Sequence, residues 1–191
     1  MASEAGVETR QLLIAAASRA FAEHGTTNAS LLDITRQAGQ RNRGAVHYHF
    51  GSREGLVAAV LDQHASFLAE RELALLALAQ ERPGDLGAAV EAAARPTTEL
   101  AEASSSGRHY VQIVAELVAE ERIDIHPDVR GALERTGGGP VYELISARMP
   151  EMPEEVRAER LALLTSFVLR AIGDRARAEE RGSTQRLGLD T

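Results

Sequence analysis

Gly25, Gly39 and Gly51 divide the first 52 residues of the chain into short segments, and each segment has helical spacing. In the first segment, apolar residues recur three and four positions apart between Leu13 and Phe21. This spacing predicts an amphipathic helix over about residues 8–24. We expect the helix to end at Gly25, because glycine adopts the left-handed conformation at little cost.

Two shorter helices are expected after the first. Ser30 is a typical N-cap, and Asp33 in the first turn suits the helix dipole. The helix that Ser30 begins should end at Gly39, and Asn42 is then the expected N-cap of a third helix over about residues 43–49. Three short helices joined by tight turns indicate a helix-turn-helix, whose last helix can enter a major groove about 12 Å wide.

The remaining residues also show helical spacing, and no run has the period of two that is typical of a strand. We expect a long fourth helix from Ser52 to about Gln80. Later helices should cover about residues 86–103 and 109–121, a short stretch before residue 137, a segment ending near 149, and a final segment from after Pro153 to about 180. The predicted fold is all-α with roughly nine helices. It comprises a helix-turn-helix domain (1–52), a larger helical domain (53–181) and a flexible tail (182–191).

Charge is distributed unevenly along the chain. The net charge is −7, yet residues 1–50 hold five arginines against four acidic residues, and no acidic residue lies between Arg36 and Arg53. Such local positive charge is typical of nucleic-acid binding. The absence of cysteine excludes disulfides and thiolate chemistry. Neither a signal peptide nor an apolar run of membrane-spanning length is visible, so we expect a cytoplasmic protein without a membrane partner.

The N-terminal region contains short motifs in a fixed order. In order and spacing they resemble the N-terminal domain of the TetR family of transcriptional regulators, over about residues 9–61. The turn at residues 40–44 is one residue longer than the usual family turn and is similar to a subgroup with Gln-Arg-Asn there. The motifs are Thr9-Arg10, Leu13-Ile14-Ala15-Ala16-Ala17, Phe21-Ala22-Glu23-His24-Gly25, Ser30-Leu31-Leu32-Asp33-Ile34, Ala38-Gly39, Tyr48-His49-Phe50 and Ser52-Arg53-Glu54-Gly55-Leu56.

Side-chain chemistry and the resemblance together indicate the DNA contacts. Arg41 and Arg43 can pair with guanine edges or with phosphates. Asn42 can cap the third helix or contact adenine, and Ala45 is small enough to approach a thymine methyl. The other predicted residues contact the groove or the phosphates. They are Ser30 and Arg53 at helix N-termini, and His47, Tyr48 and His49 on the third helix.

The larger domain is expected to bind a small-molecule effector. The helices over 86–103 and 109–121 are rich in small side chains, which leaves room for an apolar ligand with one or two polar groups; close helix packing explains the alanines equally well. The predicted lining residues are His64, Phe67, Arg95, Tyr110, Val114 and Leu117. Glu116, Glu120 and Glu121 are interpreted as a solvated helix face. No cofactor or metal is expected, because the histidines lack metal-ligand spacing.

The final helix carries a wide apolar stripe that suits burial on more than one side. With the helix before it, this stripe can form a four-helix bundle between two subunits. Closure of the core within one subunit is the alternative. The predicted dimerisation residues are Leu144, Leu161, Leu164, Val168 and Ile172.

These features predict a sequence-specific transcriptional regulator, a homodimeric repressor that an effector releases from a palindromic operator in double-stranded DNA. One alternative is a regulator of the same fold that a protein partner controls, or that has no ligand. An enzyme is the other alternative. The absence of cysteine, of a glycine-rich phosphate loop and of a nucleophile elbow argues against it.

Overall fold

The computed structural model describes residues 4–119 and 125–180, and all regular secondary structure in these ranges is α-helical. The all-α fold expected from the sequence is confirmed. The helices are α1 (Glu4–His24), α2 (Leu31–Gln37), α3 (Ala45–Phe50), α4 (Arg53–Asp62), α5 (Ala65–Gln80), α6 (Leu86–Ala103), α7 (Ser105–Ala119), α8 (Pro127–Glu134), α9 (Gly139–Arg148) and α10 (Glu154–Glu180).

The sequence predicted one long fourth helix, and this prediction is wrong. The helix is interrupted after Asp62 and forms two helices, α4 and α5. No glycine or proline lies at the break. His64 instead turns toward α7, where its Nε2 lies 3.0 Å from Oγ of Ser106 and its ring packs edge-on against Tyr110, 5.5 Å between centroids. Its φ of −111° departs from helical values. A contact distant in sequence therefore sets this boundary.

One other helix differs from expectation. α7 begins at Ser105 rather than at His109, because Oγ of Ser104 accepts a hydrogen bond from the Gly107 N–H, 3.0 Å away, at its first turn. α6 has the bounds expected from the sequence and continues through Pro96 without a break. The expected helical residues 120–121 and the expected tail at 182–191 lie outside the described ranges.

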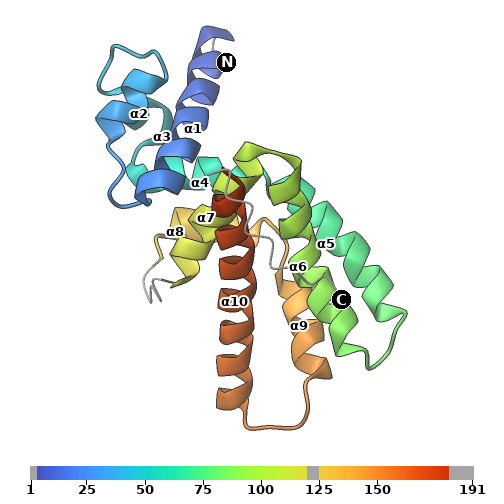
Figure 1. Ribbon diagram of the computed structural model, residues 1–191. Helices are drawn as coiled ribbons and strands as arrows, with labels where there is room; N and C mark the ends of the chain where they lie inside the picture. Colours follow the sequence, from blue (N-terminus) through green and yellow to red (C-terminus); the bar gives the residue numbers. More distant parts are fainter. Residues whose placement is uncertain (1–3, 120–124, 181–191) are drawn as a thin grey trace.

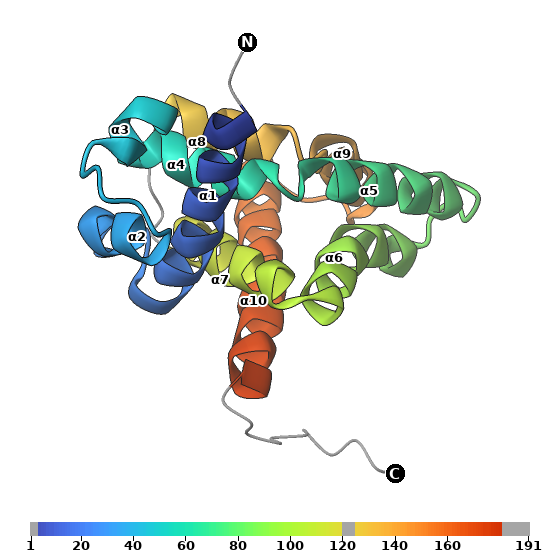
Figure 2. The ribbon, with the colours of Figure 1, turned by 90° about the horizontal axis from the view of Figure 1, so that it is seen from above.

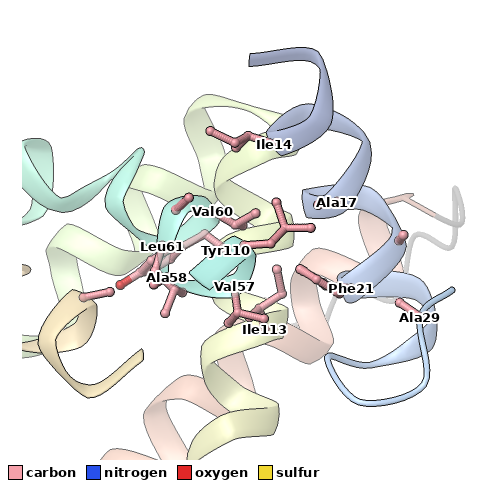
Figure 3. Packing of buried hydrophobic residues seen from close by; sticks show 14 of the residues in the cluster. Ile14, Ala17, Phe21, Ala29, Val57, Ala58, Val60, Leu61, Tyr110 and Ile113 are labelled. Atoms are coloured by element: carbon pink, nitrogen blue, oxygen red, sulfur yellow. The ribbon is translucent and has the colours of Figure 1, made fainter. Parts of the chain in front are cut away.

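One hydrophobic core joins the three N-terminal helices to the rest of the molecule. Phe21 of α1 and Leu56 of α4 are fully buried in it, together with Val111 and Ile113 of α7. Figure 3 shows Phe21 and Ile113 side by side within this cluster. Burial of side chains of this size contributes about 1.5–3 kcal/mol each. The helix-turn-helix is thus held against α4 and α7 by a shared core.

A second cluster lies among α5, α6, α9 and α10. Ala89 and Ala92 of α6 are fully buried there beside Ile145 of α9. Most alanines of α6 therefore permit close helix packing, which was one of the two explanations that the sequence left open. Ala93 is different, because it lines a cavity described below.

Both ribbon views place α2 and α3 beside α1 at one end of the molecule, away from α5, α6 and α9 (Figures 1 and 2). α9 and α10 run side by side, and α10 also packs along α7. Among the helices described, none is long and apolar enough to cross a membrane.

Candidate nucleic-acid interface and cavity

The turn between α2 and α3 is built by local hydrogen bonds. Oγ of Ser30 accepts from the Asp33 N–H at 3.2 Å and caps α2, as the sequence predicted. Gly39 ends the helix region with a φ of +70°, a conformation that L side chains rarely adopt. The chain then reverses direction with the Gln40 N–H donating to the Thr35 carbonyl at 3.0 Å. α3 is consequently held at a fixed angle to α2.

Two predictions for the start of α3 are wrong. The N-cap is Gly44 rather than Asn42, and Oδ1 of Asn42 accepts a hydrogen bond from the Gly44 N–H at 2.9 Å within the turn. Ala45 is 5% exposed and packs with Val46 in the main core, so its methyl group is not available to a thymine. The buried pair anchors α3 to the protein and directs its opposite face outward.

The outward face of α3 and the turn before it carry the predicted DNA contacts. Arg41, Arg43 and His47 are exposed, and Tyr48 is 83% exposed, an unusual value for an aromatic side chain. Among the described residues, neither arginine forms an ion pair. His49 is half-buried and packs edge-on against the Tyr48 ring at 4.9 Å between centroids. Within the described part of the chain, this surface therefore offers two guanidinium groups without an ion pair and one exposed phenol.

Arg53 has an internal role that the sequence did not suggest. Its Nη1 donates hydrogen bonds to the carbonyls of Thr26 and Ala29, at 3.0 and 2.7 Å. These are carbonyls of the loop between α1 and α2, so the guanidinium braces that loop against the start of α4. An internal brace explains the residue without a phosphate contact.

A second contact with the same loop comes from α7. Oε1 of Glu116 accepts from the Thr26 N–H at 3.0 Å and from its hydroxyl at 3.4 Å. Gly25, with a φ of +84°, lies so close that a Cβ there would be 2.9 Å from this oxygen. The interpretation of Glu116 as part of a solvated face is wrong; Glu120 and Glu121 lie outside the described residues. Glu116 is a functional candidate that the sequence analysis missed.

A cavity of about 510 Å³ lies in the larger helical region. Its wall is mostly apolar and comes from α5 to α10, with the glycine-rich segment after α8 closing one side. The lining residues are Leu68, Glu72, Val90, Ala93, Thr97, Tyr110, Val114, Val118, Leu133, Glu134, Thr136, Gly137, Gly138, Gly139, Tyr142, Leu164, Thr165, Val168 and Leu169.

The structure brings only part of the predicted effector-binding set to this cavity. Tyr110 and Val114 line it, and His64 supports the Tyr110 ring from outside; burial lowers the pKa of His64. The other three predicted residues are not in its wall. Phe67 is 43% exposed, Leu117 is buried in the main core, and Arg95 forms an ion pair with Glu91 one turn away.

Glu72 is the second residue that the sequence analysis missed. Its Oε2 accepts a hydrogen bond from the Gly138 N–H. Gly137, with a φ of +110°, lets the backbone approach this closely, since a Cβ there would be 2.9 Å from the same oxygen. Burial raises the pKa of Glu72 to about 7. The run of three glycines at 137–139 was the only sequence signal of this close approach.

The predicted dimerisation residues pack largely within their own chain. All five are half-buried; Leu144, Leu161 and Leu164 pack on the second cluster, Ile172 packs on the main core, and Val168 lines the cavity. The large apolar side chains that α10 leaves exposed are instead Leu163 (62%) and Phe167 (72%). These two lie one turn apart and form the α10 outer stripe.

The family model for bacterial regulatory proteins of the tetR family matches residues 13–60. The HTH-type transcriptional regulator TtgR of Pseudomonas putida is 44% identical over 59 residues, which are 31% of this chain and 28% of TtgR. The HTH-type transcriptional repressor AcnR of Corynebacterium efficiens is 38% identical over 64 residues, which are 34% of each chain. The matched region thus spans about a third of the length of these relatives.

The fold as a whole resembles a solved structure. It is the crystal structure of NalD, the secondary repressor of the MexAB-OprM multidrug efflux pump in Pseudomonas aeruginosa. The TM-score is 0.56 at 23% identity, and the alignment covers 93% of this chain and 88% of NalD. This likeness concerns the fold, whereas the sequence match concerns α1 to α4. Residues 13–60 therefore resemble the tetR family of bacterial regulatory proteins in sequence.

Proposed function

We propose that the chain is a homodimeric transcriptional repressor that binds a palindromic operator and is released from it by a small molecule in the cavity. The observation that carries the DNA-binding part is the surface of α3 and the turn before it. Ala45 and Val46 anchor α3 in the core, Tyr48 of α3 is exposed, and Arg41 and Arg43 are exposed in the turn. A short helix fixed from behind, with cationic and hydrogen-bonding groups in front, suits a major groove. The names of AcnR and NalD, both called repressors, support the direction of control.

The longer turn at residues 40–44 supports a distinct mode of base reading. The bond from the Gly44 N–H to Asn42 orders this turn and leaves both neighbouring arginines exposed. In this proposal Arg41 and Arg43 lie in the turn just before α3, and one contacts a guanine edge while the other contacts a phosphate. We propose that this arrangement of the two arginines characterises a subgroup with Gln-Arg-Asn in the turn.

Selection of bound sequences from random double-stranded DNA tests this function with the full chain. We expect an inverted repeat whose half-sites are about one helical turn apart, because two-fold protein symmetry imposes two-fold symmetry on the site. Enrichment should disappear when Tyr48 and Arg43 are both replaced by alanine. Equal recovery of all sequences by the unaltered protein would contradict sequence-specific binding.

The cavity supports control by a ligand rather than by no ligand. Its volume of about 510 Å³ lies within the range typical of small-molecule sites. Two connections lead from it to the helix-turn-helix. α7 carries Tyr110 on the cavity wall and Glu116 on the Thr26 loop. Arg135, next to the lining residue Thr136, pairs with Asp62 of α4 through two hydrogen bonds of 2.8 and 2.9 Å. In our proposal, a ligand that displaces α7 and the end of α8 moves the Thr26 loop and α4.

Glu116→Ala is expected to separate ligand binding from DNA release. The effector is first found by screening for molecules that release the unaltered protein from the selected DNA. This effector should still bind the variant, but it should release the variant from DNA several-fold less efficiently. Glu116→Gln, which keeps an oxygen for Thr26, should respond normally, and Glu143→Ala on the exposed face of α9 is the matched control. Fluorescence anisotropy of the labelled duplex measures the response. A normal response of Glu116→Ala would place the coupling elsewhere.

A further inference from the structure

The ionisable side chains of the cavity wall are all acidic. Its ionisable acids are Glu72 and Glu134, and none of its lining residues is an arginine or a histidine. Glu134 is exposed at the edge, whereas Glu72 is mostly withdrawn from solvent. From α6 and α10, only valine, alanine, leucine and threonine side chains face the cavity. A ligand anion would therefore meet a carboxylate and no cation.

Glu72 has one oxygen left for a ligand. Oε2 is bonded to the Gly138 N–H, and no hydrogen bond to Oε1 is present within the described part of the chain. Arg71, its neighbour on α5, pairs instead with Glu99, 2.6 Å between Nε and Oε2. A partly buried carboxylate without a cation partner is costly unless a positive charge joins it. The cavity thus contains an uncompensated acceptor beside an apolar space.

Two aromatic rings border the same space. Tyr110 of α7 is 4% exposed, and Tyr142 of α9 is half-buried; both line the cavity with Glu72. Burial is the main cause that raises the pKa of each phenol, and the Glu72 charge adds to it, so both remain neutral. Neutral aromatic faces beside a carboxylate attract cations rather than anions. Leu68, Val90 and Leu169 supply apolar wall around them.

We propose that the cavity takes an apolar molecule carrying one protonated amine, whose charge pairs with the Glu72 carboxylate between Tyr110 and Tyr142. Only the consequence of ligand binding, which is release from DNA, rests on the proposed function. Ligand binding itself does not require DNA. The apolar part of the ligand occupies the space between α6 and α10, and the amine donates to Oε1 of Glu72. Neutral or anionic molecules of the same shape bind less tightly.

The pKa of Glu72, raised to about 7 by burial, makes this preference depend on pH. Protonated Glu72 predominates below pH 7 and has no charge to offer, so cation affinity is low there and rises as the carboxyl ionises. An alkyl amine stays protonated throughout, because its pKa resembles the value of about 10.4 for lysine. Tyr110 and Tyr142 stay neutral over this range, and Glu134 at the exposed edge is the other acid facing the cavity.

The test is a calorimetric titration of the full chain, without DNA, with naphthylethylamine, naphthylethanol and naphthylacetate. At about pH 8 the amine should bind roughly tenfold or more tightly than the alcohol, the usual effect of a hydrogen bond to a charged group. Naphthylacetate should bind most weakly. The ratio of amine to alcohol affinity should fall toward one at about pH 6, when Glu72 is protonated.

Glu72→Gln keeps an acceptor for the Gly138 N–H and should abolish the preference for the amine at pH 8, so that the ratio of the two affinities no longer changes with pH. Glu134→Gln, a matched change at the exposed edge of the same cavity, should retain most of it. Equal binding of the amine and the alcohol by the unaltered protein at pH 8 would overturn the proposal. So would loss of the preference in Glu134→Gln alone. Neither result would affect operator binding, which is measured separately and tests the proposed function.

Discussion

Replacing Arg41 and Arg43 together with alanine is expected to lower affinity for the selected operator by at least about a hundredfold. Each side chain that contacts a base or a phosphate contributes on the order of 1–3 kcal/mol, and a dimer loses every contact twice. Both side chains are exposed and take part in no ion pair among the described residues, so their loss should leave the free energy of unfolding almost unchanged. Fluorescence anisotropy and a thermal melt measure the two quantities.

The single variants distinguish the two roles. A phosphate contact should weaken binding to all sequences alike and reduce its salt dependence, whereas a base contact should relax the preference at one position. Arg36→Ala is the matched control, because Arg36 lies on α2 and pairs with Asp33 at 3.2 Å. Tyr48→Phe removes only a hydroxyl and should have a smaller effect than the double variant. Unchanged affinity of the double variant would show that α3 does not enter the groove.

The sequence predicted the helix-turn-helix well where local chemistry decides. Ser30 caps α2, Ser52 caps α4, and Gly25 ends α1, each through groups within three or four residues. Such contacts are readable from sequence because the partners are a fixed number of residues apart. Which of these helices faces DNA is a prediction that rests on the resemblance to a known family.

The same analysis failed where a distant partner decides. Arg53 and Glu116 both looked solvent-facing or phosphate-facing, yet their partners are backbone atoms of the loop between α1 and α2. Glu116 is 90 positions from Thr26 in sequence, and no spacing rule reports such a pair. Ala45 shows the same limitation, since its small side chain suits a base contact and a helix contact equally well. Only the packing of α3 decides between them.

The cavity and α10 illustrate a further ambiguity. An apolar stripe at helical spacing predicts burial, but it does not say against what. Leu164 and Val168 satisfy the stripe and line the cavity of their own chain. Leu163 and Phe167, which are not among the predicted dimerisation residues, are the large apolar side chains left exposed for a partner. The two sets are interleaved along one helix, so periodicity alone cannot assign them.

Phe167→Arg is accordingly expected to convert the proposed dimer to a monomer. We propose an interface between two copies of α9 and α10, with the α10 outer stripe of each subunit against its partner. A cation introduced there is buried without a counter-charge, which costs about 3–5 kcal/mol for each copy. Sedimentation velocity measures the change. The monomer should also bind the inverted repeat at least about a hundredfold more weakly, because the second half-site no longer benefits from the effective concentration that dimerisation provides.

Leu73→Arg provides the matched control for this change. Leu73 is 67% exposed, comparable to Phe167 at 72%, but it lies on α5, away from α10 in both ribbon views. The variant should remain a dimer with normal DNA affinity. Leu164→Arg should behave differently again, since it introduces a charge into the cavity wall and should weaken binding of the naphthyl probes first. If Phe167→Arg sediments as a dimer while Leu73→Arg does not, the interface lies on α5 and the outer stripe of α10 has another role.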